Sequence, residues 1–126
     1  MRFEVIAAMA MGILLPVLET ERRGLGHWLV DFTTMFEDYV AGALLLIAAW
    51  AAIRRASFAP TLLLLAWAYN AGMMGPSLWY QVEETLRGVE PEPYNEVVIG
   101  FKLALWGTSM AGLILSYRRA IRGPAL

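Results

Sequence analysis

Cysteine is absent from this chain and histidine occurs only once, so several classes of functional site are excluded at the outset. Without cysteine there is no disulfide framework, no thiolate nucleophile and no cysteine-ligated metal. The single histidine, His27, cannot build a site that needs two histidines from one chain. The sequence also has no nucleophile elbow, phosphate-binding loop or dinucleotide fingerprint. The residues indicate no catalytic group, resident metal or cofactor, and an enzyme is the least favoured function class.

Charge is scarce, and the charged residues lie between long apolar runs. Charged residues make up 17% of the chain and hydrophobic residues 59%, and the mean hydropathy is +0.54. This pattern is typical of membrane spans rather than of a small soluble core. With 126 residues there is room for one domain and not for a nucleic-acid module. The expected partners are the lipid bilayer and other membrane helices, either in a homo-oligomer or in a larger complex.

The apolar runs predict an all-α bundle of four transmembrane helices in one membrane domain, residues 1–126. The expected spans are about 3–18, 32–53, 58–80 and 94–117. The first is short for a hydrocarbon core of ~30 Å at ~1.5 Å per residue, so we expect it to gain a turn at either end. A signal peptide is the alternative, but no small-residue cleavage pattern follows the run. A short interfacial segment with Gly24, Gly26 and Trp28 should separate the first two spans.

Residues that cap or interrupt helices predict where the helices begin and end. Ser57 is placed to cap the third helix, with Pro60 in its first turn. The Gly75–Pro76 pair should kink that helix or end it, and Gly88 is the expected stop if the helix continues beyond the span.

The arginines predict the orientation in the membrane. With four spans both termini lie on one side, which then holds six arginines against three on the other. By the positive-inside rule both termini are cytoplasmic in the cell membrane. The six are Arg2, Arg54, Arg55, Arg118, Arg119 and Arg122, and the three are Arg22, Arg23 and Arg87.

Charged residues within the spans form the candidate binding site. Glu37 and Asp38 lie five and six residues into the second span, and Lys102 lies seven residues into the fourth. Both spans run inward from the external side, so at ~1.5 Å per residue the depths agree within about a turn. Isolated charges at this depth are costly and pairing removes much of that cost. We therefore predict that Lys102 pairs with Asp38 or Glu37.

Further polar residues could extend this cluster into a pocket open to the outside. Asn70 lies near the middle of the third span. Two acids against one lysine leave one carboxylate over, which is a candidate for proton exchange because burial disfavours its charged form. The same polar groups could instead only hold helices in register. The other polar side chains of this predicted cluster are Thr33, Thr34, Tyr39 and Tyr69.

Small residues at helical spacing predict close contact between helices. Ala8 and Gly12 are four apart in the first span, and a second series runs along one face of the fourth. The favoured function is an accessory or structural subunit, or a self-associating bundle, assembled through these faces. The alternative is a small carrier or channel-like protein that binds a proton, cation or polar solute at the acid and lysine cluster. The second series is Gly100, Ala104, Gly107 and Ala111.

Overall fold

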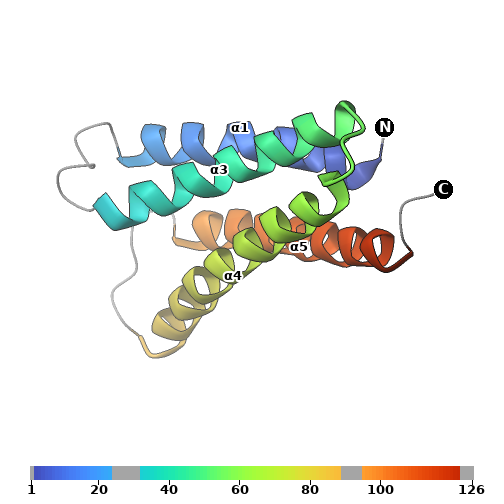
Figure 1. Cartoon of the computed structure of the whole chain (residues 1–126). Helices are drawn as coiled ribbons and strands as arrows, with labels where there is room; N and C mark the ends of the chain where they lie inside the picture. The colour runs from blue at the N-terminus through green and yellow to red at the C-terminus, as the bar shows by residue number, and fades with distance from the viewer. Residues whose placement is uncertain (1, 24–31, 89–94, 123–126) are drawn as a thin grey trace.

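The computed structural model describes residues 2–23, 32–88 and 95–122, and over these ranges the regular secondary structure is α-helix, without a strand. The described helices are α1 (Phe3–Arg23), α3 (Phe32–Ile53), α4 (Ala59–Leu86) and α5 (Asn95–Arg122). In Figure 1, α1, α3 and α5 lie roughly along one direction and α4 is inclined to them. The all-helical prediction is confirmed for the described residues. The interfacial segment expected at Gly24 to Trp28 lies outside them.

The helices extend beyond the predicted spans. α1 continues from Leu18 to Arg23, α4 from Tyr80 to Leu86 and α5 from Tyr117 to Arg122. The additional residues are mostly polar or charged, and they continue a helix that the apolar run has already formed, because extending a helix is easier than starting one.

The turn between α3 and α4 is closed by the backbone. Ala56 donates its N–H to the carbonyl of Ala51 at 3.0 Å, and Arg55 donates to Ala52 at 3.1 Å. This is a Schellman motif, in which the residue after the helix adopts the left-handed conformation. Arg55 has that conformation, with φ 57°.

The predicted cap at Ser57 is wrong. The N-cap residue of α4 is Phe58 and no side chain caps it, although Pro60 lies in the first turn as expected. The Schellman turn places the chain so that the helix begins one residue later than the serine requires, and the Phe58 carbonyl accepts from the N–H of Leu62 at 3.0 Å.

α4 continues through Gly75–Pro76 and does not end there. Proline removes one helical hydrogen bond, but beyond it Leu78 is fully buried and Gln81 is bonded to α5, so tertiary contacts hold the remaining turns. The predicted stop at Gly88 is confirmed. Gly88 has φ 78° and donates its N–H to the Thr85 carbonyl at 3.2 Å.

Contacts between the helices define two pairs. α1 packs along α3 and α4 packs along α5, while α3 contacts α4 and α5 contacts α1. α3 and α5 lie on a diagonal and barely touch. The buried core is formed mainly by small and aliphatic side chains around Trp67, which is fully buried.

Large apolar side chains cover much of the outside. Among them Trp50 is 55% exposed and Phe101 is 59% exposed. Two described helices are long and apolar enough to cross a membrane, Met35–Ile53 and Asn95–Arg122, each with a mean hydropathy of 1.6. Of these apolar windows, 33% and 11% respectively are buried.

Candidate polar sites between the helices

The predicted acid cluster lies near the beginning of α3. Glu37 is exposed, whereas Asp38 and Tyr39 are half-buried. The Tyr39 hydroxyl is hydrogen-bonded to the Thr20 hydroxyl of α1. The side chain of Thr34, another predicted member, falls outside the described part of the chain.

Tyr69 of α4 lies within range of the charges of both acids on α3. It is 37% exposed, so this group of side chains is partly open at the surface. Thr33, one turn before Glu37, is exposed as well. The acids therefore lie on a part of α3 that contacts α1 through Tyr39 and Thr20.

Lys102 donates hydrogen bonds to two side chains of α4. Its Nζ atom donates to Gln81 Oε1 at 2.7 Å and to Ser77 Oγ at 3.0 Å. Because α3 and α5 are diagonal, the acids and the lysine belong to helices that share little surface. The pairing of Lys102 with Glu37 or Asp38 remains a prediction.

The Lys102 contacts belong to a longer polar ladder between α4 and α5. Gln81 Nε2 donates to Asn95 Oδ1 at 2.8 Å, and Asn95 Nδ2 donates to Thr85 Oγ1 at 2.9 Å. The hydroxyl of Thr85 in turn donates to the backbone carbonyl of Gln81 at 2.9 Å. Sequence reasoning missed this ladder. The signal was present, since Ser77, Gln81 and Thr85 are spaced four apart and so share one face of α4.

Asn70 belongs to a second, fully buried contact between the same helices. Its Nδ2 donates to Ser109 Oγ at 2.6 Å, and that hydroxyl lies 2.8 Å from the Leu105 carbonyl. The Asn70 Oδ1 atom is buried and has no partner among the described residues. The Asn70 side chain thus forms its hydrogen bond with α5, and not with the acids on α3.

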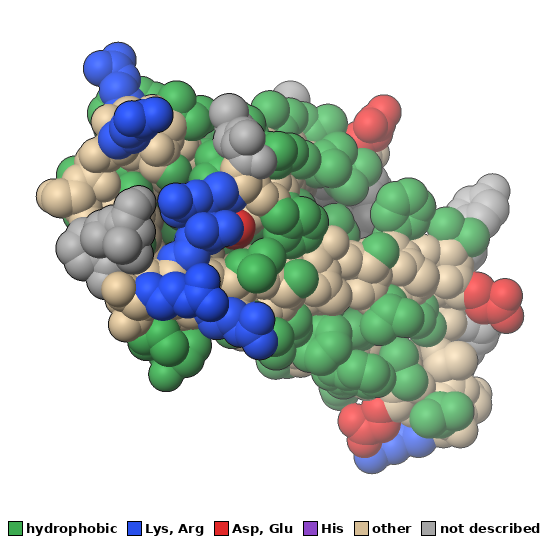
Figure 2. All heavy atoms as spheres, turned by 90° about the vertical axis from the view of Figure 1, so that its right-hand side faces the viewer, with side chains coloured by type: hydrophobic (Ala, Val, Ile, Leu, Met, Phe, Trp, Pro, Cys, Tyr) green, Lys and Arg blue, Asp and Glu red, His purple; other side chains and the backbone are tan. Residues whose placement is uncertain are grey.

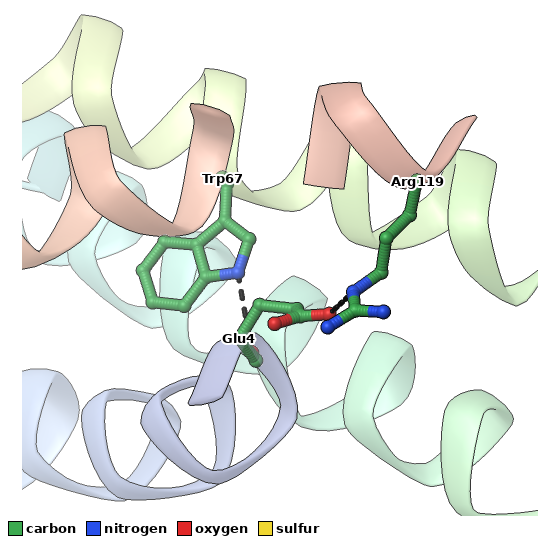
Figure 3. Close-up of polar contacts among 3 residues, drawn as sticks. All are labelled: Glu4, Trp67 and Arg119. Carbon is green, nitrogen blue, oxygen red and sulfur yellow. Dashed lines mark hydrogen bonds and ion pairs between the residues drawn. The ribbon is translucent and has the colours of Figure 1, made fainter. Parts of the chain in front are cut away.

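Among the described residues the most buried charged side chain is Glu4, in the first turn of α1. It is fully buried, and its Oε1 atom forms an ion pair with Arg119 Nε of α5 (Figure 3). Trp67 Nε1 donates to the Glu4 backbone carbonyl at 3.3 Å. This cluster, Glu4–Trp67–Arg119, joins three helices at the end of the molecule that carries the six arginines.

Gly112 makes room for the Trp67 indole. A Cβ atom at this position would lie 2.4 Å from Trp67 Cε2, closer than two carbon atoms can approach. Sequence analysis overlooked the Glu4–Trp67–Arg119 cluster, because a glutamate this close to the start of a span reads as a solvent-exposed end. Nothing local in the sequence indicates that α5 returns to cover it.

Within the described residues, no group of three or more histidine, aspartate or glutamate side chains is placed to hold a metal ion. Comparison of the chain with protein-family models found no match, and comparisons with curated proteins and with solved structures found none either. These comparisons assign no family to the chain.

Proposed function

We propose that this chain is a small multi-pass membrane protein that serves as an accessory or structural subunit. In this role it associates with further membrane helices, either those of a second copy or those of a larger complex. The observation that carries the proposal is the distribution of side chains, with large apolar groups outside and hydrogen-bonded polar groups between the helices. In water the opposite arrangement is favoured, with apolar side chains inside the protein and polar side chains at its surface.

The exposed apolar surface supports placement in a bilayer. Soluble monomers rarely expose continuous apolar patches of more than a few hundred Å². Here apolar side chains are exposed along the outer faces of all four described helices, and only 11% of the apolar window of α5 is buried. With both termini on the arginine-rich side, the positive-inside rule favours cytoplasmic termini.

The open face of α5 supports association with other helices. Gly100 and Gly107 have no atom within 4 Å of the position that a Cβ would take, and Ala104 between them is exposed. Small residues let two helix backbones approach closely, which is a main source of helix association in lipid. None of the described residues covers this face of α5 at either glycine.

The test is the mass of the protein after gentle detergent extraction from its native membrane, for the natural chain and two variants. Gly107→Leu fills the open face of α5. Gly72→Leu adds the same bulk to α4, where a Cβ would likewise meet no atom within 4 Å, and serves as the matched control. We expect the natural chain and Gly72→Leu to be recovered as a complex, and Gly107→Leu as a folded monomer.

Recovery of the natural chain as a monomer would contradict the subunit proposal. Equal loss of the complex in both variants would show that added bulk anywhere on the surface is sufficient, and would remove α5 as the contact face. Recovery in the soluble fraction without detergent would contradict membrane placement itself.

A carrier or channel-like role is the second candidate, favoured by the buried Asn70 Oδ1 atom without a described partner. A buried carbonyl oxygen in this state can accept a hydrogen bond from a polar solute or help coordinate a cation. In this role Glu37, Asp38 and Lys102 would supply charge at the external side. The Glu37→Gln/Asp38→Asn double variant should then abolish proton or cation uptake into proteoliposomes. Unchanged folding and unchanged uptake in that variant would exclude the role.

A further inference from the structure

The two ends of the bundle differ in charge. The N-terminus of α1, the α3–α4 turn and the C-terminus of α5 lie together at one end (Figure 1). This end, the arginine end, carries six arginines and a single acidic residue, Glu4. In space-filling view most of the Lys and Arg side chains on this face gather in one group, with apolar side chains beside them (Figure 2).

Glu4 cannot neutralise this group as a whole. It is fully buried, and its Oε1 atom is taken by Arg119. The Arg119 side chain is 36% exposed, so it covers the acid and still reaches the surface of the protein. Five positive charges at the arginine end remain without an acidic partner in this region of the sequence.

The other arginines of this end are exposed. Arg118 and Arg122 are both exposed and four residues apart, so they share one face of the last turns of α5. Arg54 lies over the Trp50 ring, with its guanidinium carbon 5.3 Å from the ring centroid. Tryptophan is enriched at the membrane–water interface, so this contact holds an arginine at the depth of the lipid headgroups.

We infer that the arginine end binds the phosphate groups of anionic phospholipids. Guanidinium groups donate paired hydrogen bonds to phosphate, and each basic residue close to an anionic membrane surface strengthens binding. Because these arginines have no acidic partner at this end of the bundle, they can bind a lipid phosphate without first breaking an ion pair. The inference rests on the proposed placement in a membrane.

The experiment is native mass spectrometry of the detergent-solubilised protein, titrated with phosphatidylglycerol and, separately, with phosphatidylcholine. We expect phosphatidylglycerol to bind more tightly. Arg122→Gln should weaken its binding about fivefold and Arg118→Gln/Arg122→Gln about twenty-fivefold, the values expected for the loss of one and two basic residues. Arg122→Lys keeps the charge but loses the paired guanidinium hydrogen bonds, so it should weaken binding, though less than Arg122→Gln does.

Arg87→Gln is the matched control. Arg87 lies at the opposite end of the bundle, is exposed and pairs with Glu83, so its loss makes the same change in net charge without affecting the arginine end. We expect no change in lipid binding. Equal weakening by Arg87→Gln and Arg122→Gln would overturn the inference, because overall charge and not the arginine end would then decide binding.

Two further outcomes separate this inference from the proposed function. Equal binding of both lipids by a protein that stays in the membrane fraction would overturn the lipid inference alone. Recovery in water without detergent, with neither lipid bound, would overturn both. Displacement of phosphatidylglycerol by millimolar inorganic phosphate would identify free phosphate as the ligand and would also count against a lipid site.

Discussion

The two helix pairs are held together in different ways. α1 and α3 meet at Gly12 and Gly42, where a Cβ on Gly42 would lie 2.8 Å from the Gly12 carbonyl oxygen and 2.7 Å from Pro16 Cγ. This contact is made by backbone and a proline ring. Away from this crossing the Thr20 hydroxyl of α1 is bonded to the Tyr39 hydroxyl of α3. α4 and α5 are joined by a larger set of side-chain hydrogen bonds, through the Lys102–Gln81 bond and the ladder beyond it and through the buried Asn70–Ser109 contact.

The difference shows two solutions to one problem. In the membrane placement proposed above, apolar burial gives little driving force for helices to associate, so close packing and hydrogen bonds have to supply it. The α1–α3 pair depends on the absence of side chains at one crossing and therefore tolerates no added atoms there. The α4–α5 pair also has a close glycine contact, Gly112 on Trp67, but it spreads its polar contacts over several hydrogen bonds, so the loss of one bond should be a partial loss.

The largest effect should come from filling the α1–α3 crossing. Gly42→Leu places a side chain against the Gly12 backbone and the Pro16 ring, neither of which can move away without separating the helices. We expect a loss of more than about 3 kcal/mol in the free energy of unfolding, at or beyond the usual range for overpacking. The measurement is unfolding in mixed micelles followed by circular dichroism.

Gly72→Leu is again the control, because it adds the same side chain where nothing is displaced. A stability of Gly42→Leu equal to that of Gly72→Leu would show that the α1–α3 crossing is not tightly packed.

The next effect tests the ion pair that connects the two helix pairs. Arg119→Gln leaves the Glu4 carboxylate buried without its cation, which should cost about 3 kcal/mol. Glu4→Gln should cost less, about 1 kcal/mol, because Arg119 is 36% exposed and can turn towards solvent. Unfolding of both variants under the same conditions measures the asymmetry. Equal losses would mean that both charges are equally accessible to water.

A smaller effect is expected in the α4–α5 pair. Asn70→Ala and Ser109→Ala each remove one partner of a fully buried hydrogen bond. A double-mutant cycle should give a coupling energy of about 1 kcal/mol, within the range measured between membrane helices. A coupling near zero would show that the 2.6 Å contact contributes nothing to holding α4 on α5.

The smallest effect should be stabilising and lies outside both pairs. Arg55 has φ 57° in the α3–α4 turn, a conformation that glycine adopts with less strain. Arg55→Gly should therefore raise the free energy of unfolding by about 0.5 kcal/mol, since relief of strain exceeds the added freedom of the unfolded chain. Arg54→Gly removes the same charge one residue earlier, without positive φ to relieve, and should give no gain. Equal effects would assign the change to charge.

Much of the helical architecture could be predicted from local sequence. The end of α4 at Gly88 and the proline in its first turn were predicted because glycine and proline restrict or free the backbone wherever they occur. The close approach at Gly12 was also predicted from its spacing with Ala8, and Gly12 now contacts Gly42. Ser57 failed as a cap because the turn before it, and not the serine itself, decided where the helix begins.

The candidate sites were less predictable. Depth along the spans predicted that Lys102 pairs with Glu37 or Asp38, and this pairing stays a prediction, because depth carries no information on which helices are neighbours. The structure places α4 beside α5, so the recorded bonds of Lys102 are to Ser77 and Gln81. The Glu4–Arg119 pair joins residues 115 positions apart in the chain, and no spacing rule connects them.

The sequence alone thus determined that the described chain is helical, where apolar runs lie and which end carries the arginines, because these depend on neighbours along the chain. Only the tertiary structure decided which polar side chains meet. Those partnerships depend on the order of helices around the bundle and on the rotation of each helix about its axis. Both result from packing such as Gly12 on Gly42 and Trp67 on Gly112, where removing a side chain sets how closely two elements approach.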